Sequence, residues 1–154
     1  MKALIHALKI ERHLQLCVLA CDRYSHRNIE KHAELVEVAL RADNAKWKGR
    51  FEFNSTTMSL TLSGPSLRNI DAQYGCIIRS LNPLSLVLER TGFDLNNLSG
   101  LLLHSLRVVG QDIDNVKFFN DLPLLKTLEL QGGKLSLEAR ERILKSPVKL
   151  IEIK

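Results

Sequence analysis

One short pattern of residues occurs five times along the sequence. The stretch SLRVVGQDI, Ser105–Ile113, returns 22 positions later (127 − 105) as TLELQGGKL, Thr127–Leu135. Two earlier stretches, SLTLSGPSL at Ser59–Leu67 and SLVLERTGF at Ser85–Phe93, follow the same order of residue types, and LIEIK is a shortened copy. Numbered from the first aliphatic residue of each copy, position 0 is Leu60, Leu86, Leu106, Leu128 and Ile151, and position +2 is Leu62, Leu88, Val108, Leu130 and Ile153. A chain that repeats one pattern at intervals of 20 to 26 residues is expected to build the same structural unit several times.

The pattern has a direct structural interpretation. Side chains alternate along a strand, so positions 0 and +2 point to the same side of it. An apolar residue at position +7 lies past a turn, and Gly64, Gly110 and Gly132 at position +4 favour a sharp bend there. One such unit cannot bury its own apolar side, whereas stacked units bury one another. We therefore expect an α/β fold with a parallel sheet of about five short strands and helical or irregular arms on the other side.

In this frame the sequence resembles the leucine-rich repeat family, whose period is about 20–29 residues. It is most similar to the short bacterial repeats of planctomycete and verrucomicrobial proteins, which are about 22 residues long. The resemblance covers roughly residues 44–154 and implies a solenoid with an N-terminal helical cap. The family often carries Asn or Cys at position +5, where the side chain ties neighbouring turns together. Position +5 here is Pro65, Thr91, Gln111 and Gly133, so we expect no ladder of side chains along the turns.

The region before the repeats is predicted to form their cap, within a single domain spanning residues 1–154. Residues 1–43 read as two helices, Ala7–Tyr24 and Ser25–Asp43. Ser25 is a candidate N-cap of the second helix, whose apolar stripe is formed by Ile29, Ala33, Val36 and Leu40. Residues 44–57 read as a turn and a hairpin strand, with the hairpin bend near Asn54–Thr57, and residues 58–154 as the leucine-rich repeats.

No cap is expected at the other end, where Leu150–Ile153 is predicted to be a strand with an open edge. Three alternatives stay open. Lys149 and Lys154 keep this edge solvated, a partner covers it, or the chain is a piece of something longer. Self-association of the chain through this strand is one form of the second alternative. The stretch just before it, Leu137–Ser146, reads as a solvated helix with Glu–Arg and Glu–Lys pairs four residues apart.

Composition narrows the class of protein. The chain has 154 residues, 45% of them hydrophobic, and a net charge of +5. It has no apolar run of about 18 residues, so no membrane-spanning helix or membrane partner is expected, and its N-terminus lacks a signal-peptide pattern. The three cysteines, Cys17, Cys21 and Cys76, are an odd number, which argues against a disulfide framework. We interpret them as reduced thiols and expect a cytoplasmic protein.

Two residue groups could carry chemistry, and for both we favour a structural role. His13, Cys17 and Cys21 fall on one helical face with spacing i, i+4, i+8, but three ligands on two turns cannot close around one tetrahedral ion. The basic residues Lys46, Lys48 and Arg50 surround Trp47, an arrangement that could hold phosphates and stack a base, or simply leave Trp47 in the cap. Phosphate loops and hydrolase motifs are absent from the sequence. We expect no enzyme, no cofactor and no metal.

The side chains that point outward from the predicted strands are the candidate binding residues. They occupy positions +1 and +3 of the copies: Thr61, Val87, Glu89, Arg107, Val109, Glu129 and Gln131. Small hydroxyl residues, Ser59, Ser85, Ser105 and Thr127, stand at position −1. Few lysines and an outward Val87 are typical of an interface centre. The alternative is that Arg107 and Glu129 merely pair across neighbouring strands.

These observations predict a protein–protein interaction module that binds its partner through the exposed face of the repeat sheet. One alternative is a structural subunit of a larger assembly, docking by the open C-terminal edge or by the basic ends of the chain, in the latter case on RNA. Another is a regulatory domain of a longer enzyme. Nucleic acid ranks below protein as a partner, because the positive charge is small and divided between the two ends.

Overall fold

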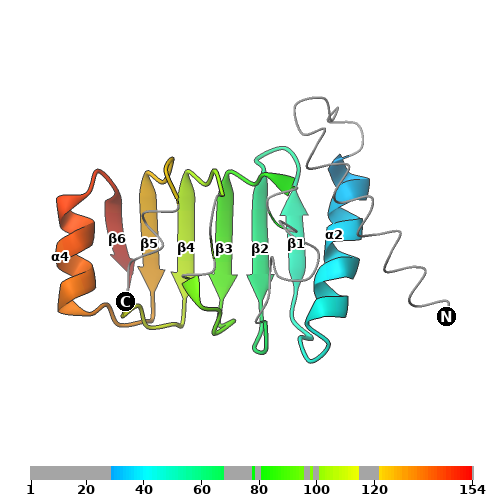
Figure 1. The fold of residues 1–154 in the computed structure, drawn as a ribbon, viewed down its shortest axis with the longest axis horizontal. Helices are drawn as coiled ribbons and strands as arrows, with labels where there is room; N and C mark the ends of the chain where they lie inside the picture. The colour runs from blue at the N-terminus through cyan, green and yellow to red at the C-terminus, as the bar shows by residue number, and fades with distance from the viewer. Residues whose placement is uncertain are drawn as a thin grey trace.

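The computed structural model describes residues 29–67, 78, 81–95, 98, 101–114 and 122–153 of the chain. These residues form a mixed α/β fold with a six-stranded sheet and two helices (Figure 1). In chain order the elements are α2 (Ile29–Asp43), β1 (Phe51–Asn54), β2 (Ser59–Ser63), β3 (Ser85–Glu89), β4 (Ser105–Val109), β5 (Thr127–Gln131), α4 (Leu137–Lys145) and β6 (Lys149–Ile153). The predicted first helix, with His13, Cys17 and Cys21, lies outside the described residues, and so do Ser25 and Cys76.

The strands lie in the sheet in the order in which they occur in the chain, β1 to β6. β1 is antiparallel to β2, and the four pairings from β2 to β6 are parallel. Their register places the sequence copies side by side, so one row across the sheet is Leu60, Leu86, Leu106, Leu128 and Leu150. Positions 0 and +2 of β2 to β5 are buried and the residues between them are partly exposed. The predicted strands and alternation are therefore confirmed for the four full copies.

The predicted register of the last strand is wrong by one residue. The sequence frame put Ile151 at position 0, whereas the sheet pairs Leu128 with Leu150. Ile151 consequently belongs to the outer side of the sheet, and Glu152 takes the inner position +2. An acidic residue is tolerated there because Arg140 of α4 bonds both of its carboxylate oxygens, at 2.6 Å each.

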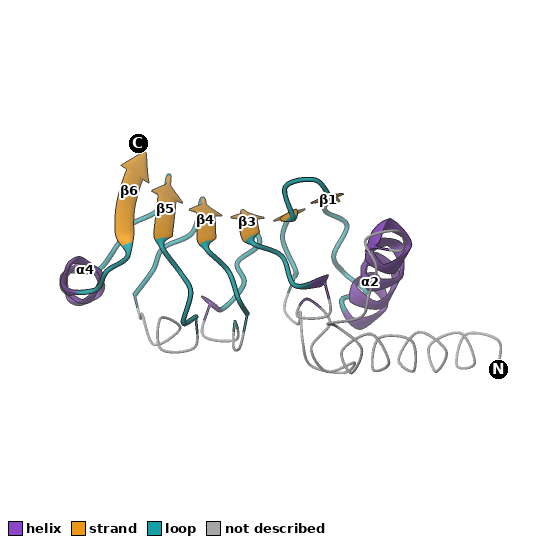
Figure 2. Cartoon of the chain, turned by 90° about the horizontal axis from the view of Figure 1, so that it is seen from above, coloured by secondary structure: helices purple, strands orange, loops and turns teal. Residues whose placement is uncertain are grey.

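Helix α4 lies beyond β6 at the end of the sheet (Figures 1 and 2). Ser136 caps it by accepting a hydrogen bond from the backbone N–H of Ala139 at 3.1 Å. Ala139 and Ile143 are buried, while Glu138 and Arg142 form an exposed pair at 3.8 Å, as the sequence predicted. The helix therefore has one buried side, and its Arg140 contacts β6 through Glu152. That this end of the sheet has no cap stays a prediction.

The Arg140–Glu152 pair is expected to make the stability of the fold depend on pH. Hydrogen bonds from the Arg140 guanidinium lower the pKa of Glu152 below its ordinary value of 4.5. A carboxyl group with a lowered folded-state pKa stabilises the fold above its unfolded-state pKa, and this contribution disappears as the pH falls through the folded-state pKa. Glu152→Gln should thus be less stable than the unchanged chain at pH 7, with the gap closing in acid. Urea unfolding between pH 7 and pH 2.5 measures it, with exposed Glu141→Gln as control. A gap that is the same at every pH would contradict the assignment.

At the opposite end of the sheet, α2 packs its apolar stripe against the core (Figure 2). Ala33, Val36 and Leu40 are buried, and Ile29 packs against them from a partly exposed position, as predicted. The β1–β2 hairpin also forms as predicted, and Asn54 closes its bend by accepting hydrogen bonds from the backbone N–H groups of Thr56 and Thr57. The hairpin thus joins α2 to the parallel strands.

Trp47 fills the junction between α2 and the hairpin. Its side chain is 1% exposed, and its indole N–H donates to the carbonyl oxygen of Ser63 at 2.8 Å. The guanidinium of Arg41 lies 4.6 Å from the ring centroid and also donates to the carbonyl of Gly49 at 3.0 Å. A Cβ atom on Gly49 would lie 1.5 Å from the same Ser63 oxygen, so this position admits only glycine. The interpretation of Trp47 as a plug of the cap is consistent with these contacts.

Candidate functional site

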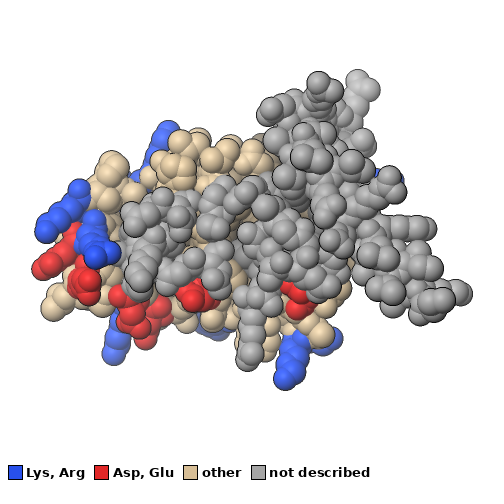
Figure 3. All heavy atoms as spheres, viewed as in Figure 1, with Lys and Arg blue, Asp and Glu red and all other residues tan. Residues whose placement is uncertain are grey.

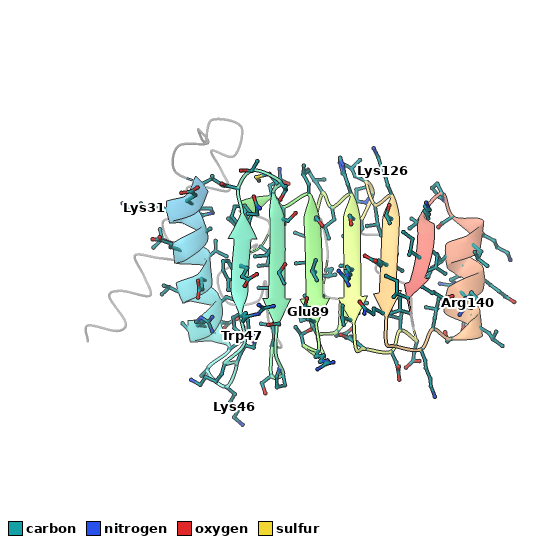
Figure 4. All side chains as sticks on the ribbon, turned by 180° about the vertical axis from the view of Figure 1, so that it is seen from behind. Lys31, Lys46, Trp47, Glu89, Lys126 and Arg140 are labelled. Carbon is teal, nitrogen blue, oxygen red and sulfur yellow. The ribbon has the colours of Figure 1, made fainter. Side chains whose placement is uncertain are left out.

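The outer face of the sheet, defined by positions +1 and +3 of β2 to β6, is the candidate functional site. The pairing register brings the seven predicted residues together on it in two rows. The +1 row is Thr61, Val87, Arg107 and Glu129, and the +3 row includes Glu89, Val109 and Gln131. All seven are partly exposed, because each is flanked by side chains of the neighbouring strands. Figure 4 shows side chains standing out from the strands, with Glu89 labelled on β3.

The charged groups on the outer face are paired with one another. The guanidinium of Arg107 lies 3.6 Å from the carboxylate of Glu129 on the next strand, and it also donates a hydrogen bond to the side-chain oxygen of Gln131. Glu89 has a similar partner in Arg50, at 3.6 Å. The cross-strand pairing that the sequence left as an alternative therefore exists. Exposed pairs of this kind contribute only about 0–1 kcal/mol, so they leave the surface adaptable.

Two apolar residues of the outer face were missed in the sequence analysis. Ile151 lies beside Glu129 in the +1 row, and Ile153 lies beside Gln131 in the +3 row. They were missed because the last copy was read one residue out of register. A signal for the correct frame was present, since the step of 22 residues from Leu106 to Leu128 leads onward to Leu150. The Arg107–Glu129 pair consequently has an apolar neighbour on each side in its row.

The turns beyond the strands are linked more closely than predicted. The side-chain amide of Gln111 donates to the carbonyl oxygen of Phe93 on the neighbouring turn, and Asp112 accepts from the backbone N–H of Lys134 at 2.8 Å. The expectation of no side-chain link along the turns is therefore wrong at Gln111. At the next copy a Cβ on Gly133 would lie 2.0 Å from the Gln111 carbonyl oxygen, which explains why no larger residue continues the ladder. These links hold the strands, and thus the outer face, in register.

No protein-family model, curated protein or solved structure matches the chain. The leucine-rich repeat resemblance thus rests on the sequence pattern alone.

The basic residues around Trp47 are the other candidates, and of these Arg50 borders the outer face through Glu89. Lys46, Lys48 and Arg50 are exposed, but Trp47 between them is buried under Arg41, so its ring is not available to stack a base. No group of three or more His, Cys, Asp or Glu side chains that could hold a metal ion occurs in the part of the chain that the structure describes. Nor is any helix among those residues long and apolar enough to cross a membrane.

Proposed function

We propose that the chain is a leucine-rich repeat solenoid that binds a partner protein through the outer face of its sheet. The repeat interpretation is supported by the coincidence of the sequence copies with the strands. The copies found in the sequence coincide with the parallel strands β2 to β5, and their first leucines meet in one row across the sheet. Each copy buries its leucines against the next, as stacked repeats do.

The proposed binding role rests on one observation about the outer face: its central charges are paired and lie between apolar residues. Val87 adjoins Arg107, Ile151 adjoins Glu129, and the two charged groups are 3.6 Å apart. Covering an unpaired charge with a partner is unfavourable, whereas a pair that is already formed carries its own compensation. Interface centres are likewise poor in unpaired charge and enriched in arginine and apolar groups. This composition suits a protein partner, in keeping with a cytoplasmic interaction module or scaffold.

Two other functions stay as alternatives. A structural subunit would use the edge of the sheet or the basic ends of the chain, and a regulatory domain would act on an enzyme to which it is joined. Both alternatives leave the outer face without a bound partner. Crosslinking from residues of that face therefore distinguishes them from the proposal. A nucleic-acid partner is less favoured, because the basic residues near Trp47 lack an available aromatic ring.

Photo-crosslinking tests the proposal. A benzophenone side chain placed at Val109, in the middle of the outer face, should form adducts with a partner in native cell extract. The matched position is Leu124, which is also exposed but precedes β5 at the end of the strand. We expect adducts of one discrete mass from position 109 and none of that mass from position 124. Adducts of the same mass from position 124 alone would place the binding site elsewhere.

A further inference from the structure

Strand β6 has one edge without a strand partner among the described residues. The backbone N–H of Lys149 donates to the carbonyl of Lys126 at 2.8 Å, and the carbonyl of Ile153 accepts from Gly132 at 3.3 Å, so these residues direct their backbone groups toward the preceding copy. Backbone groups alternate in direction along a strand. Those of Leu150 and Glu152 therefore point to the opposite, open edge. The backbone N–H and C=O groups of Ile151 point toward β5, like those of Lys149 and Ile153.

An apolar stripe on α4 borders this open edge. Leu137 and Leu144 are 79% and 67% exposed and lie two helical turns apart. Arg140 stands between them, three residues after one and four before the other, so the three share one side of the helix. Because Arg140 bonds Glu152 of β6, the side that carries the two leucines is turned toward the edge strand. Unpaired backbone groups and exposed leucines thus occur next to each other at this end of the sheet.

We propose that an extended segment of a partner protein adds to β6 as a further strand, with its inward side chains covering Leu137 and Leu144. Strand addition uses main-chain hydrogen bonds for affinity and alternate side chains for specificity. Here the unpaired backbone groups of Leu150 and Glu152 would supply the main-chain hydrogen bonds. The exposed leucines of α4 would select the side chains of the added strand. This edge site is separate from the outer face, so either could exist without the other.

The charge of this end specifies an acidic occupant. Residues 134–154 contain six Lys or Arg and three Asp or Glu, a net charge of +3. Two of the acidic residues are held by arginines, Glu152 by Arg140 and Glu138 by Arg142. Figure 3 shows basic and acidic side chains side by side at the α4 end of the molecule. A segment that alternates apolar and acidic residues would thus place its apolar side chains on the α4 stripe and its carboxylates toward these cations.

A second copy of the chain suits this edge less well than a lone segment. Helix α4 lies beyond β6, so a copy adding through its own β6 would bring its α4 to the same place (Figure 1). Packed helices need about 8–10 Å between their axes. An extended segment carries no helix and avoids this conflict.

Binding of designed peptides to the full chain tests the edge site. The probes are a ten-residue peptide of alternating valine and glutamate and its valine–lysine counterpart, followed by fluorescence anisotropy at low salt. We expect the acidic peptide to bind about tenfold or more tightly than the basic one. Leu144→Glu should weaken it about tenfold, and Leu124→Glu, an equally simple change at an exposed leucine elsewhere, less than about twofold.

Amide hydrogen exchange supplies a second readout. The acidic peptide should slow exchange at Leu150 and Glu152 and leave Ile151 unchanged, because that amide already faces β5. Equal binding of the two peptides, or equal effects of the two leucine variants, would overturn the proposal. So would a dimer in light scattering without peptide that Leu144→Glu abolishes, because a second copy would then occupy the edge.

Discussion

Replacing Trp47 with alanine should lower the free energy of unfolding by about 3–5 kcal/mol. The ring is 1% exposed and lies where α2, the hairpin and the turn after β2 meet. Its removal leaves a cavity, leaves the carbonyl of Ser63 without its indole donor and takes away the surface on which Arg41 rests. We expect the loss to be large because Gly49 and Gly64 approach each other too closely for the surrounding backbone to collapse into the space.

Urea unfolding followed by circular dichroism measures this effect without relying on tryptophan fluorescence. Lys46→Ala and Lys48→Ala are the controls, because both side chains flank Trp47 and are exposed. Each should change stability by no more than about 0.5 kcal/mol. A Trp47→Ala variant as stable as these controls would show that the ring is not part of the core.

Leu128→Ala should lower the free energy of unfolding by about 2–5 kcal/mol. Leu128 lies on the inner side of β5, is fully buried and pairs in register with Leu106 and Leu150. Truncation loses the transfer free energy of the side chain and opens a cavity between neighbouring copies. The cost is expected toward the upper part of the range, because the strands on both sides are held in register by backbone hydrogen bonds and cannot close the gap.

Arg107→Glu, on the outer face of the adjacent strand β4, is the comparison. Its guanidinium is partly exposed and contributes through one ion pair and one hydrogen bond. The expected loss is about 1 kcal/mol, part of it from placing a second carboxylate beside Glu129. Thermal and urea unfolding of the two variants should therefore differ clearly. Equal destabilisation by both would contradict the assignment of inner and outer sides.

The strands could be predicted from the sequence because the signal was repeated. Position 0 and position +2 are aliphatic in each full copy, and four agreeing copies define a frame that one strand alone would leave ambiguous. The same reasoning failed at the last copy, because Ile151 and Ile153 satisfy the aliphatic pattern while the sheet places Leu150 at position 0 and the acidic Glu152 at position +2. What decides the register is the partner of Glu152, which is Arg140 on another element. Such a contact is not visible in a linear pattern.

Two features of the site were likewise beyond the pattern. The hydrogen bond from Gln111 to Phe93 depends on how closely neighbouring turns approach each other. No such bond was expected at position +5, because the residue there is neither Asn nor Cys. The burial of one side of α4 depends on its position beyond β6. The pairing of Arg107 with Glu129, by contrast, follows from the frame alone, because equal positions in successive copies are neighbours in a parallel sheet.

The proposal that the outer face binds a protein is tested most directly by capture of the photo-crosslinked partner with charge variants of the Arg107–Glu129 pair. Arg107→Glu should abolish capture, because a reversed charge at an interface centre is left unpaired. The double variant Arg107→Glu with Glu129→Arg restores an opposite-charge pair, so it should recover the stability of the unchanged chain and part of the capture. Capture by both variants at the level of the unchanged chain, with the fold intact by circular dichroism, would contradict the outer face as the binding surface.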